Sequence, residues 1–147
     1  MRYTRTATIA APPADVWAVL IDLERWPDWT ASMREITRLD AGALRVGSTA
    51  RVRQPTGKPR IWTVTELAAD RSFTWTSTAP GLHLAGYHEL TPTERGVRAE
   101  LTFALTGPLA WLGALLAGRR MRRDVGLEAD GLTRAAERRA QERAVDE

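Results

Sequence analysis

Few residues of this chain are able to transfer protons near neutral pH. Cysteine is absent, and only two histidines occur, His83 and His88. This inventory argues against thiol nucleophiles, zinc–cysteine sites and multi-histidine metal sites, so we expect neither a metal nor a cofactor. His88 is the natural candidate for acid–base chemistry, because the pKa of histidine lies close to neutral pH. Such a group is suited to enolisation, aldol closure or dehydration of a bound ketone.

Glu128 is the second candidate for acid–base chemistry. The stretch from Pro108 to about Arg143 has the apolar spacing of a long helix. At about 100° per residue, Glu128 falls on the same stripe as Met121 and Val125, which we expect to face the interior. A carboxyl group in that position is energetically costly unless it has a polar partner.

Other catalytic patterns are missing from the sequence. No serine stands in a motif that presents it to a base, no pair of carboxylates suits glycoside hydrolysis, and the glycines form no phosphate-binding loop. The net charge is +3, but 18 acidic residues are interspersed among 21 basic ones, so we expect no nucleic-acid partner. The basic run at residues 119–123 is interpreted as a solvated helix face. The alternative is an interfacial helix whose arginines meet anionic lipid headgroups.

Seven strands and three helical segments are needed to position these residues. Alternating apolar residues predict strands at Tyr3–Ile9, Met33–Leu39, Thr49–Gln54, Arg60–Leu67, Ser72–Thr78, Leu82–Leu90 and Val97–Thr106. A short helix is predicted at Pro13–Ile21, a second short helix or tight turn at Asp22–Trp29, and a long helix from Pro108 to about Arg143. Short turns between consecutive strands favour an antiparallel meander, so the predicted class is α+β.

The tryptophans have two predicted roles. Trp17, Trp26 and Trp29 are expected to pack under the two short segments, and Trp111 is expected in the core or at its rim. Trp62 and Trp75 lie on central strands, in phase with other inward-facing residues. At least one of these two is expected to contact a binding cavity, since ligand pockets are mostly apolar with a few polar groups.

The order of these features resembles a known superfamily. The matching segments are Ile9–Trp17, Asp22 with Trp26–Trp29, Val46–Ser48 with Arg53–Pro55, Trp62–Leu67, Phe73–Trp75, His88 with Leu90, and Gly107–Leu109. Together they resemble the START-like, or SRPBCC, superfamily, in the branch of polyketide cyclases/dehydrases and lipid transport proteins. The resemblance covers residues 3–140, and we expect residues 1–147 to form one such domain. It implies a helix-grip fold, in which a curved seven-stranded antiparallel sheet wraps around the long C-terminal helix, with two short helices after the first strand.

The resemblance also implies a cavity for a small apolar or aromatic molecule between the sheet and the long helix. The residues expected to bind that ligand are Trp62, Val64, Phe73, Trp75, His88, Phe103, Met121, Val125 and Glu128. A hairpin that pairs Leu90 with Val97 and His88 with Ala99 brings His88 within about one helical turn of Glu128. We therefore predict that His88 and Glu128 form a polar pair at one end of the cavity and are its catalytic residues if it is an enzyme. The alternative is a tilted helix, with Glu128 at a wet mouth and His88 as an ordinary strand residue.

Three functions remain open from the sequence. The first is a ligand-binding protein without an established activity. The second is a polyketide cyclase or dehydratase that uses His88 and Glu128, and the third is a peripheral lipid carrier. The uncharged stretch Leu101–Gly118 is expected to divide at Gly107-Pro108 into a strand and a helix start, so we expect no integral membrane span and a cytoplasmic location. The sequence leaves the oligomeric state and the ligand's identity open.

Overall fold

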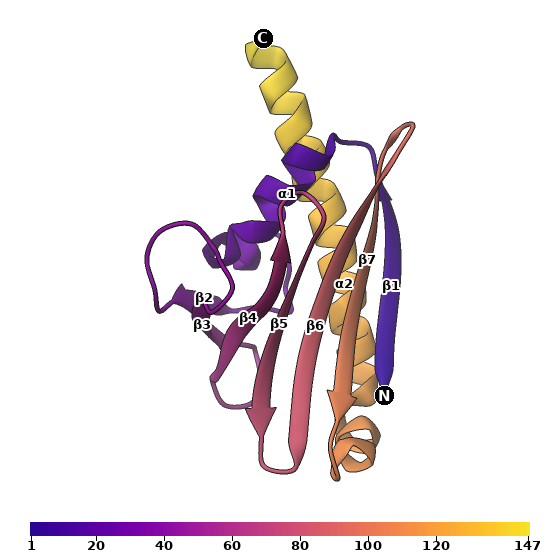
Figure 1. Cartoon of the computed structure of the whole chain (residues 1–147). Coiled ribbons are helices and arrows are strands. Elements are labelled where there is room, and N and C mark those ends of the chain that lie inside the picture. The colour runs from indigo at the N-terminus through magenta and orange to yellow at the C-terminus, as the bar shows by residue number, and fades with distance from the viewer.

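The computed structural model describes residues 1–147 and has one antiparallel sheet with a long helix across one face (Figure 1). The strands are β1 (Arg2–Ile9), β2 (Glu35–Arg38), β3 (Thr49–Arg53), β4 (Arg60–Ala68), β5 (Ser72–Ala79), β6 (Leu82–Thr93) and β7 (Gly96–Thr106). The helices are α1 (Pro13–Ile21), the 3-10 helix η1 (Leu23–Asp28) and α2 (Ala110–Asp146). The spatial strand order is β1-β7-β6-β5-β4-β3-β2, so the first strand closes the meander beside the last. The predicted α+β helix-grip fold is confirmed.

The uncharged stretch 101–118 is divided as predicted. β7 ends at Thr106, and α2 begins at Ala110, after Gly107 has taken a positive φ of 103°. A residue with a side chain rarely adopts that conformation, which explains the glycine at the break. No helix is both long and apolar enough to cross a membrane.

The hairpin of β6 and β7 corrects the predicted strand register. His88 pairs with Leu101 rather than Ala99, and Leu90 pairs with Ala99 rather than Val97. The prediction ended β6 at Leu90, but the strand continues to Thr93 and turns tightly before Gly96. Beyond Leu90 the alternation of buried and exposed residues stops, because residues 91–95 are all exposed. In that part the strand is extended by its backbone pairing with β7.

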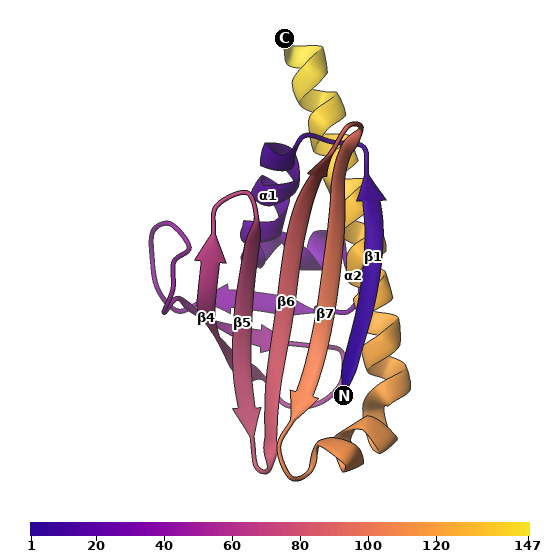
Figure 2. The same ribbon diagram turned by 45° about the vertical axis from the view of Figure 1, so that its right-hand side comes forward.

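The α2 helix lies mainly along one edge of the sheet. It packs against β1, β7 and α1 and makes few contacts with β6, as the two ribbon views agree (Figures 1 and 2). Two glycines mark close approaches: a Cβ on Gly118 would lie 2.8 Å from the Tyr3 hydroxyl oxygen, and one on Gly131 would collide with the Trp29 carbonyl oxygen. These contacts set the position of α2 over the sheet.

An ion cluster around one buried carboxylate fastens the far half of α2 to α1. Asp15 is almost fully buried and accepts hydrogen bonds from Nη2 of Arg143 at 2.7 Å and from its Nε at 3.0 Å. Arg139 adds an ion pair at 3.4 Å. The hydrogen bonds from Arg143 hold the pKa of Asp15 below its usual value, although burial opposes this. The two guanidinium groups offset the free-energy cost of removing this carboxylate from water.

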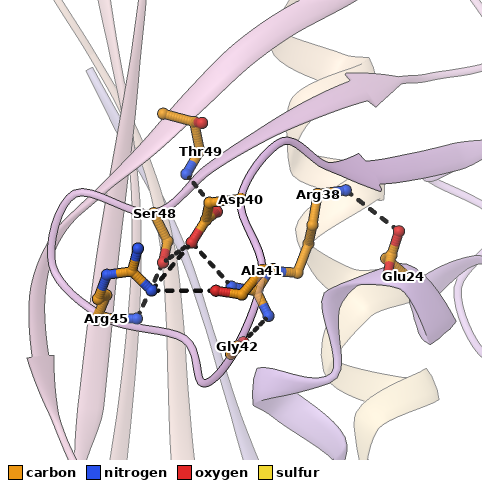
Figure 3. A network of polar contacts seen from close by, with 8 residues as sticks. All are labelled: Glu24, Arg38, Asp40, Ala41, Gly42, Arg45, Ser48 and Thr49. Atoms are coloured by element: carbon orange, nitrogen blue, oxygen red, sulfur yellow. Dashed lines mark hydrogen bonds and ion pairs between the residues drawn. The ribbon is translucent and has the colours of Figure 1, made fainter.

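The loop between β2 and β3 is held by its own polar network (Figure 3). Asp40 accepts hydrogen bonds from the Ser48 hydroxyl at 2.9 Å and the Thr49 backbone N–H at 3.2 Å, and it forms an ion pair with Arg38. The backbone N–H of Arg38 donates to Glu24 of η1 at 3.2 Å. This network fixes the edge of the sheet beside η1.

Gly131 gives a direct test of how α2 is positioned. Its Cβ would meet the Trp29 backbone, which has no room to move, so Gly131→Ala should lower the free energy of unfolding by at least about 1–3 kcal/mol. Urea unfolding measures this change. Gly126→Ala is the matched control: its Cβ would meet only the flexible end of Arg5, and alanine favours a helix by up to ~1 kcal/mol. Equal stabilities for the two variants would contradict the close approach.

Candidate functional site

A cavity of about 110 Å³ lies between the sheet and α2. Most of its lining is aromatic or aliphatic: Trp26, Met33, Val52, Trp62, Trp75, Leu82, Leu84, Leu101, Phe103, Leu105, Met121 and Val125. The ionisable and amide side chains on its wall are Gln54, Arg60, His88, Arg120, Asp124 and Glu128. An apolar cavity of ~150 Å³ holds a benzene ring. The volume therefore suits a molecule about the size of one aromatic ring rather than an extended lipid chain.

Three tryptophans form a continuous aromatic wall. The Trp75 ring lies 5.3 Å from that of Trp26 and 5.2 Å from that of Trp62, and the Trp62 ring lies 6.2 Å from Phe103. Trp75 also lies against the strand β6 at Gly86, where an added Cβ would come within 2.7 Å of the indole nitrogen. Gly86 therefore leaves room for the Trp75 ring, which a side chain at this position would displace.

The indole N–H groups of the tryptophans differ in their hydrogen-bond partners. Trp26 donates its Nε1–H to the Leu20 carbonyl at 2.9 Å. The Nε1 atom of Trp29 is buried and has no hydrogen-bond partner. Trp62 and Trp75 both line the cavity, and no hydrogen bond joins the Nε1 atom of either ring to a protein acceptor. Nε1 of Trp75 lies beside Gly86 of β6. The wall thus includes two indole rings whose N–H groups have no protein acceptor.

His88 is buried and held in one tautomer. Its ring stacks on Phe73, its pairing neighbour on β5, with centroids 4.1 Å apart. Nδ1–H donates to the Phe73 carbonyl at 3.1 Å, which leaves a lone pair on Nε2. No hydrogen bond joins Nε2 to a protein group, and His88 lines the cavity. Burial lowers the pKa of His88 to about 4, which makes it a neutral acceptor at physiological pH.

Glu128 is partly buried and lies on the α2 side of the cavity. Its Oε1 accepts a hydrogen bond from the Ser32 hydroxyl at 3.3 Å, and that hydroxyl is 2.7 Å from the Thr30 hydroxyl. Burial raises the pKa of Glu128 to about 8, and the nearby Asp124 adds to the rise, while the Ser32 bond opposes it. The carboxyl group is therefore mostly protonated at neutral pH and can donate a hydrogen bond.

The predicted pair of His88 and Glu128 is not formed as a direct contact. No hydrogen bond or ion pair joins them, because each has another partner: the Phe73 carbonyl for His88 and the Ser32 hydroxyl for Glu128. The two-residue error in hairpin register removes the basis of the prediction. Both side chains nevertheless line the same cavity, one from the sheet and one from the helix.

The structure places most of the residues expected to bind a ligand on the cavity wall. The seven on the wall are Trp62, Trp75, His88, Phe103, Met121, Val125 and Glu128, whereas Val64 and Phe73 do not line it. Both face inward, as alternation requires, but Val64 is buried in the core and Phe73 is covered by His88 and Trp26. Alternation therefore identifies the inner face of a strand but not which part of that face stays uncovered.

Several residues of the wall were not predicted. Trp26, expected to serve only as packing, forms part of the aromatic wall, and Trp111, expected in or beside the core, is 64% exposed. Asp124 precedes Glu128 by four residues, so helical periodicity is a signal for it. Arg120 belongs to the basic run interpreted as a solvated face; it is exposed but also reaches the cavity wall. Ser32 had no such signal, because it comes from a loop and reaches Glu128 only through the fold.

The cavity has a polar rim where the β3–β4 connection meets α2. Arg120 donates from Nη1 to the Thr56 hydroxyl and so links α2 to that connection. Gln54 donates its Nε2–H to the Ser32 carbonyl at 3.2 Å. Burial raises the pKa of Asp124, and the charges of Arg120 and Arg123 oppose the rise. Protonatable and cationic groups therefore gather at this rim, beside the apolar interior.

The sequence matches the model of the family described as polyketide cyclase/dehydrase and lipid transport over residues 1–137. The chain belongs to this family. No curated protein sequence matches the chain. The match confirms the family that the motifs resembled, and it does not assign an activity to this member.

Solved structures share the fold at low sequence identity. A Thermus thermophilus protein is 20% identical with a TM-score of 0.73, over 92% of this chain and 97% of that one. A hypothetical protein from Helicobacter pylori is 16% identical with a TM-score of 0.78, over 92% and 88% of the two chains. The di-domain ARO/CYC protein StfQ of the steffimycin biosynthetic pathway is 17% identical with a TM-score of 0.73, over 98% of this chain and 51% of StfQ. These likenesses establish the architecture alone.

The pKa values of the two cavity groups predict how stability varies with pH. The pKa of Glu128 is 4.5 in the unfolded protein and about 8 in the folded protein. Its contribution to the free energy of unfolding is therefore complete below pH 4.5 and is lost as the pH rises to about 8. His88 acts in the opposite sense: its contribution is complete above pH 6.5 and is lost as the pH falls to about 4. Of these two contributions to the free energy of unfolding, only that of Glu128 still changes with pH above pH 6.5.

Glu128→Gln isolates that change, because an amide stays neutral at every pH. Relative to the wild type, the free energy of unfolding of Glu128→Gln should increase by about 2 kcal/mol between pH 6.5 and pH 9. Urea unfolding at several pH values measures the difference. Glu142→Gln, at an exposed position of the same helix, should follow the wild-type profile. Parallel profiles for wild type and Glu128→Gln would show that Glu128 is not held neutral.

Proposed function

We propose that the protein binds a small apolar or aromatic molecule in the cavity between the sheet and α2. The observation that supports this most is the aromatic wall of Trp26, Trp62 and Trp75 around an open volume of about 110 Å³. Burying apolar ligand surface there provides the binding energy, at roughly 25 cal/mol per Å². The volume favours a compact ring system over an extended acyl chain.

The polar groups of the wall define the ligand further. Trp62 and Trp75 line the cavity, and an indole N–H there suits a carbonyl or hydroxyl oxygen on the ligand. Nε2 of His88 accepts a hydrogen bond, and the protonated Glu128 donates one. A hydroxylated or ketone-bearing aromatic ring satisfies donors and acceptors together, whereas a pure hydrocarbon leaves them unpaired.

A second candidate function is acid–base catalysis on such a ketone. It is favoured by two groups of one cavity in complementary states: His88 neutral with a free lone pair, and Glu128 protonated with a pKa of about 8. In enolisation, Nε2 of His88 would take the proton next to the carbonyl while a donor holds the developing oxyanion. The low pKa of His88 limits its strength as a base, so binding without catalysis is the primary proposal.

Ligand identity is tested first on the purified protein. Native mass spectrometry should detect a co-purifying molecule of low mass, and its release after denaturation allows its identification. For the catalytic candidate, proton exchange of an aromatic ketone such as α-tetralone into D2O is followed by NMR. Exchange that is no faster with the wild type than with His88→Gln would exclude catalysis by His88.

Val125→Trp tests whether the cavity is the binding site. Val125 lines the cavity from α2, and an indole at this position fills most of the volume. Thermal stabilisation by the co-purifying ligand, or by added aromatic ketones, should therefore be abolished. Differential scanning fluorimetry with and without ligand measures this shift in Tm.

The matched control is Arg134→Trp, which adds the same side chain at an exposed position of α2. It should keep the ligand-induced shift. Because overpacking costs about 1–3 kcal/mol, Val125→Trp must first be shown to fold by circular dichroism. An undiminished ligand shift in a folded Val125→Trp protein would place the binding site elsewhere.

A further inference from the structure

Exposed apolar side chains gather at one end of the molecule, which we call the apolar end: Met1, Leu109, Trp111, Leu115 and Leu116. Backbone contacts hold its parts together. The Met1 amino group donates to the Leu105 carbonyl at 3.0 Å, and the Leu109 N–H donates to the Gly81 carbonyl at 3.0 Å. The chain start, the β5–β6 turn and the first turns of α2 therefore meet at this end, as Figures 1 and 2 show.

The apolar residues of α2 at this end are not part of the core. Trp111 is 64% exposed, Leu115 is 74% exposed and Leu116 is 77% exposed. At about 100° per residue, Leu115 and Leu116 lie on the side of the helix away from Met121, which faces the cavity, and Trp111 lies about 80° from Met121. Large exposed apolar groups that cluster together mark an interaction surface, whereas single ones do not.

Basic residues follow the apolar residues along the same helix. The next turns of α2 carry Arg119, Arg120, Arg122 and Arg123, and no acidic residue lies between Glu100 and Asp124. Arg119, Arg122 and Arg123 are exposed and fall on the same broad face as Trp111 and Leu115. The surface thus has an apolar tip and, one to two helical turns behind it, a positively charged band.

We propose that this end of the protein docks on an anionic lipid bilayer. The tip residues would enter the boundary between headgroups and acyl chains, and the arginines would lie at the level of the phosphates. A tryptophan at the border between the two zones suits that position, because its ring is amphipathic. Docking here goes beyond the binding of a ligand in the cavity and does not depend on it.

Charge favours a membrane over a second copy of the chain. In a symmetric dimer formed through this surface, the same patch would face itself, and the arginine bands would repel across the axis. An anionic bilayer instead neutralises all of them. The β5–β6 turn, Ala79–Leu82, is uncharged and contributes nothing that opposes close approach.

The cavity lies close to this surface. Leu82 and Leu105 line the cavity, and both lie within ordinary contact of the position that a Cβ on Gly113 would occupy, in the first turns of α2. A molecule that partitions into the bilayer would therefore meet the cavity wall within one layer of side chains from the docked surface.

Vesicle co-sedimentation tests the proposal. The wild type should bind phosphatidylcholine vesicles containing phosphatidylglycerol, should bind pure phosphatidylcholine vesicles weakly, and should be partly released by high salt. Leu115→Ser with Leu116→Ser should weaken binding more than tenfold, because two exposed leucines lose their apolar contact with the acyl chains. Val46→Ser with Val145→Ser, at exposed sites outside this surface, is the matched apolar control and should bind like the wild type.

The charge contribution has its own pair of variants. Arg119→Gln with Arg123→Gln should reduce the affinity for anionic vesicles about 30-fold, from about fivefold per arginine. Arg134→Gln with Arg138→Gln, exposed on the distant half of α2, should change it much less. The proposal is overturned if the wild type binds no anionic vesicles, or if the leucine variant binds them like the wild type. Analytical ultracentrifugation showing a dimer that only the leucine variant dissociates would assign the surface to a second copy instead.

Discussion

The cavity depends on where α2 is held over the sheet. The helix lies close to β1, β7 and α1, where Gly118 and Gly131 allow backbone and side chains to approach without a Cβ between them. The buried Asp15 and its two arginine partners fix the other half of the helix to α1. Because α2 is anchored on that side, it does not fill the space above β4 and β5. The large aromatic residues of those strands line the space that remains.

Burial has opposite effects on Glu128 and His88, two of the ionisable groups on the cavity wall, and leaves both neutral at neutral pH. Desolvation raises the pKa of a carboxyl group and lowers that of an imidazole, because in each case it disfavours the charged form. Glu128 and His88 therefore offer hydrogen-bonding groups to the cavity without adding charge of their own at neutral pH. This is the condition under which an apolar wall and a polar ligand group are compatible. A charged pair in the same place would attract water and ions instead of an aromatic ring.

The long helix has different environments along its length. Its first turns carry exposed apolar residues and arginines, its middle supplies Met121, Val125 and Glu128 to the cavity, and its last part is tied to α1 through Arg139 and Arg143. One element thus links an outer surface, an inner site and a structural anchor. The hydrophobic stripe of the middle part is what the fold requires, while the apolar residues of the first turns are not required by it.

The sequence by itself determined the architecture. Alternation along seven segments, glycine and proline at the turns, and apolar spacing in the last third predicted the seven strands, α1 and α2, because these periodicities follow from local backbone geometry. They left η1 open as a short helix or a tight turn, and the wrapping of the sheet around α2 was implied by the family resemblance. They also predicted which strand faces are buried, including Trp62, Trp75 and His88. The tertiary structure alone decided the details of the site. These are the hairpin extension that shifts the pairing partner of His88 on β7 by two residues, the loop that brings Ser32 to Glu128, and the stacking of His88 on Phe73. These depend on packing between segments far apart in the chain, which no local period encodes.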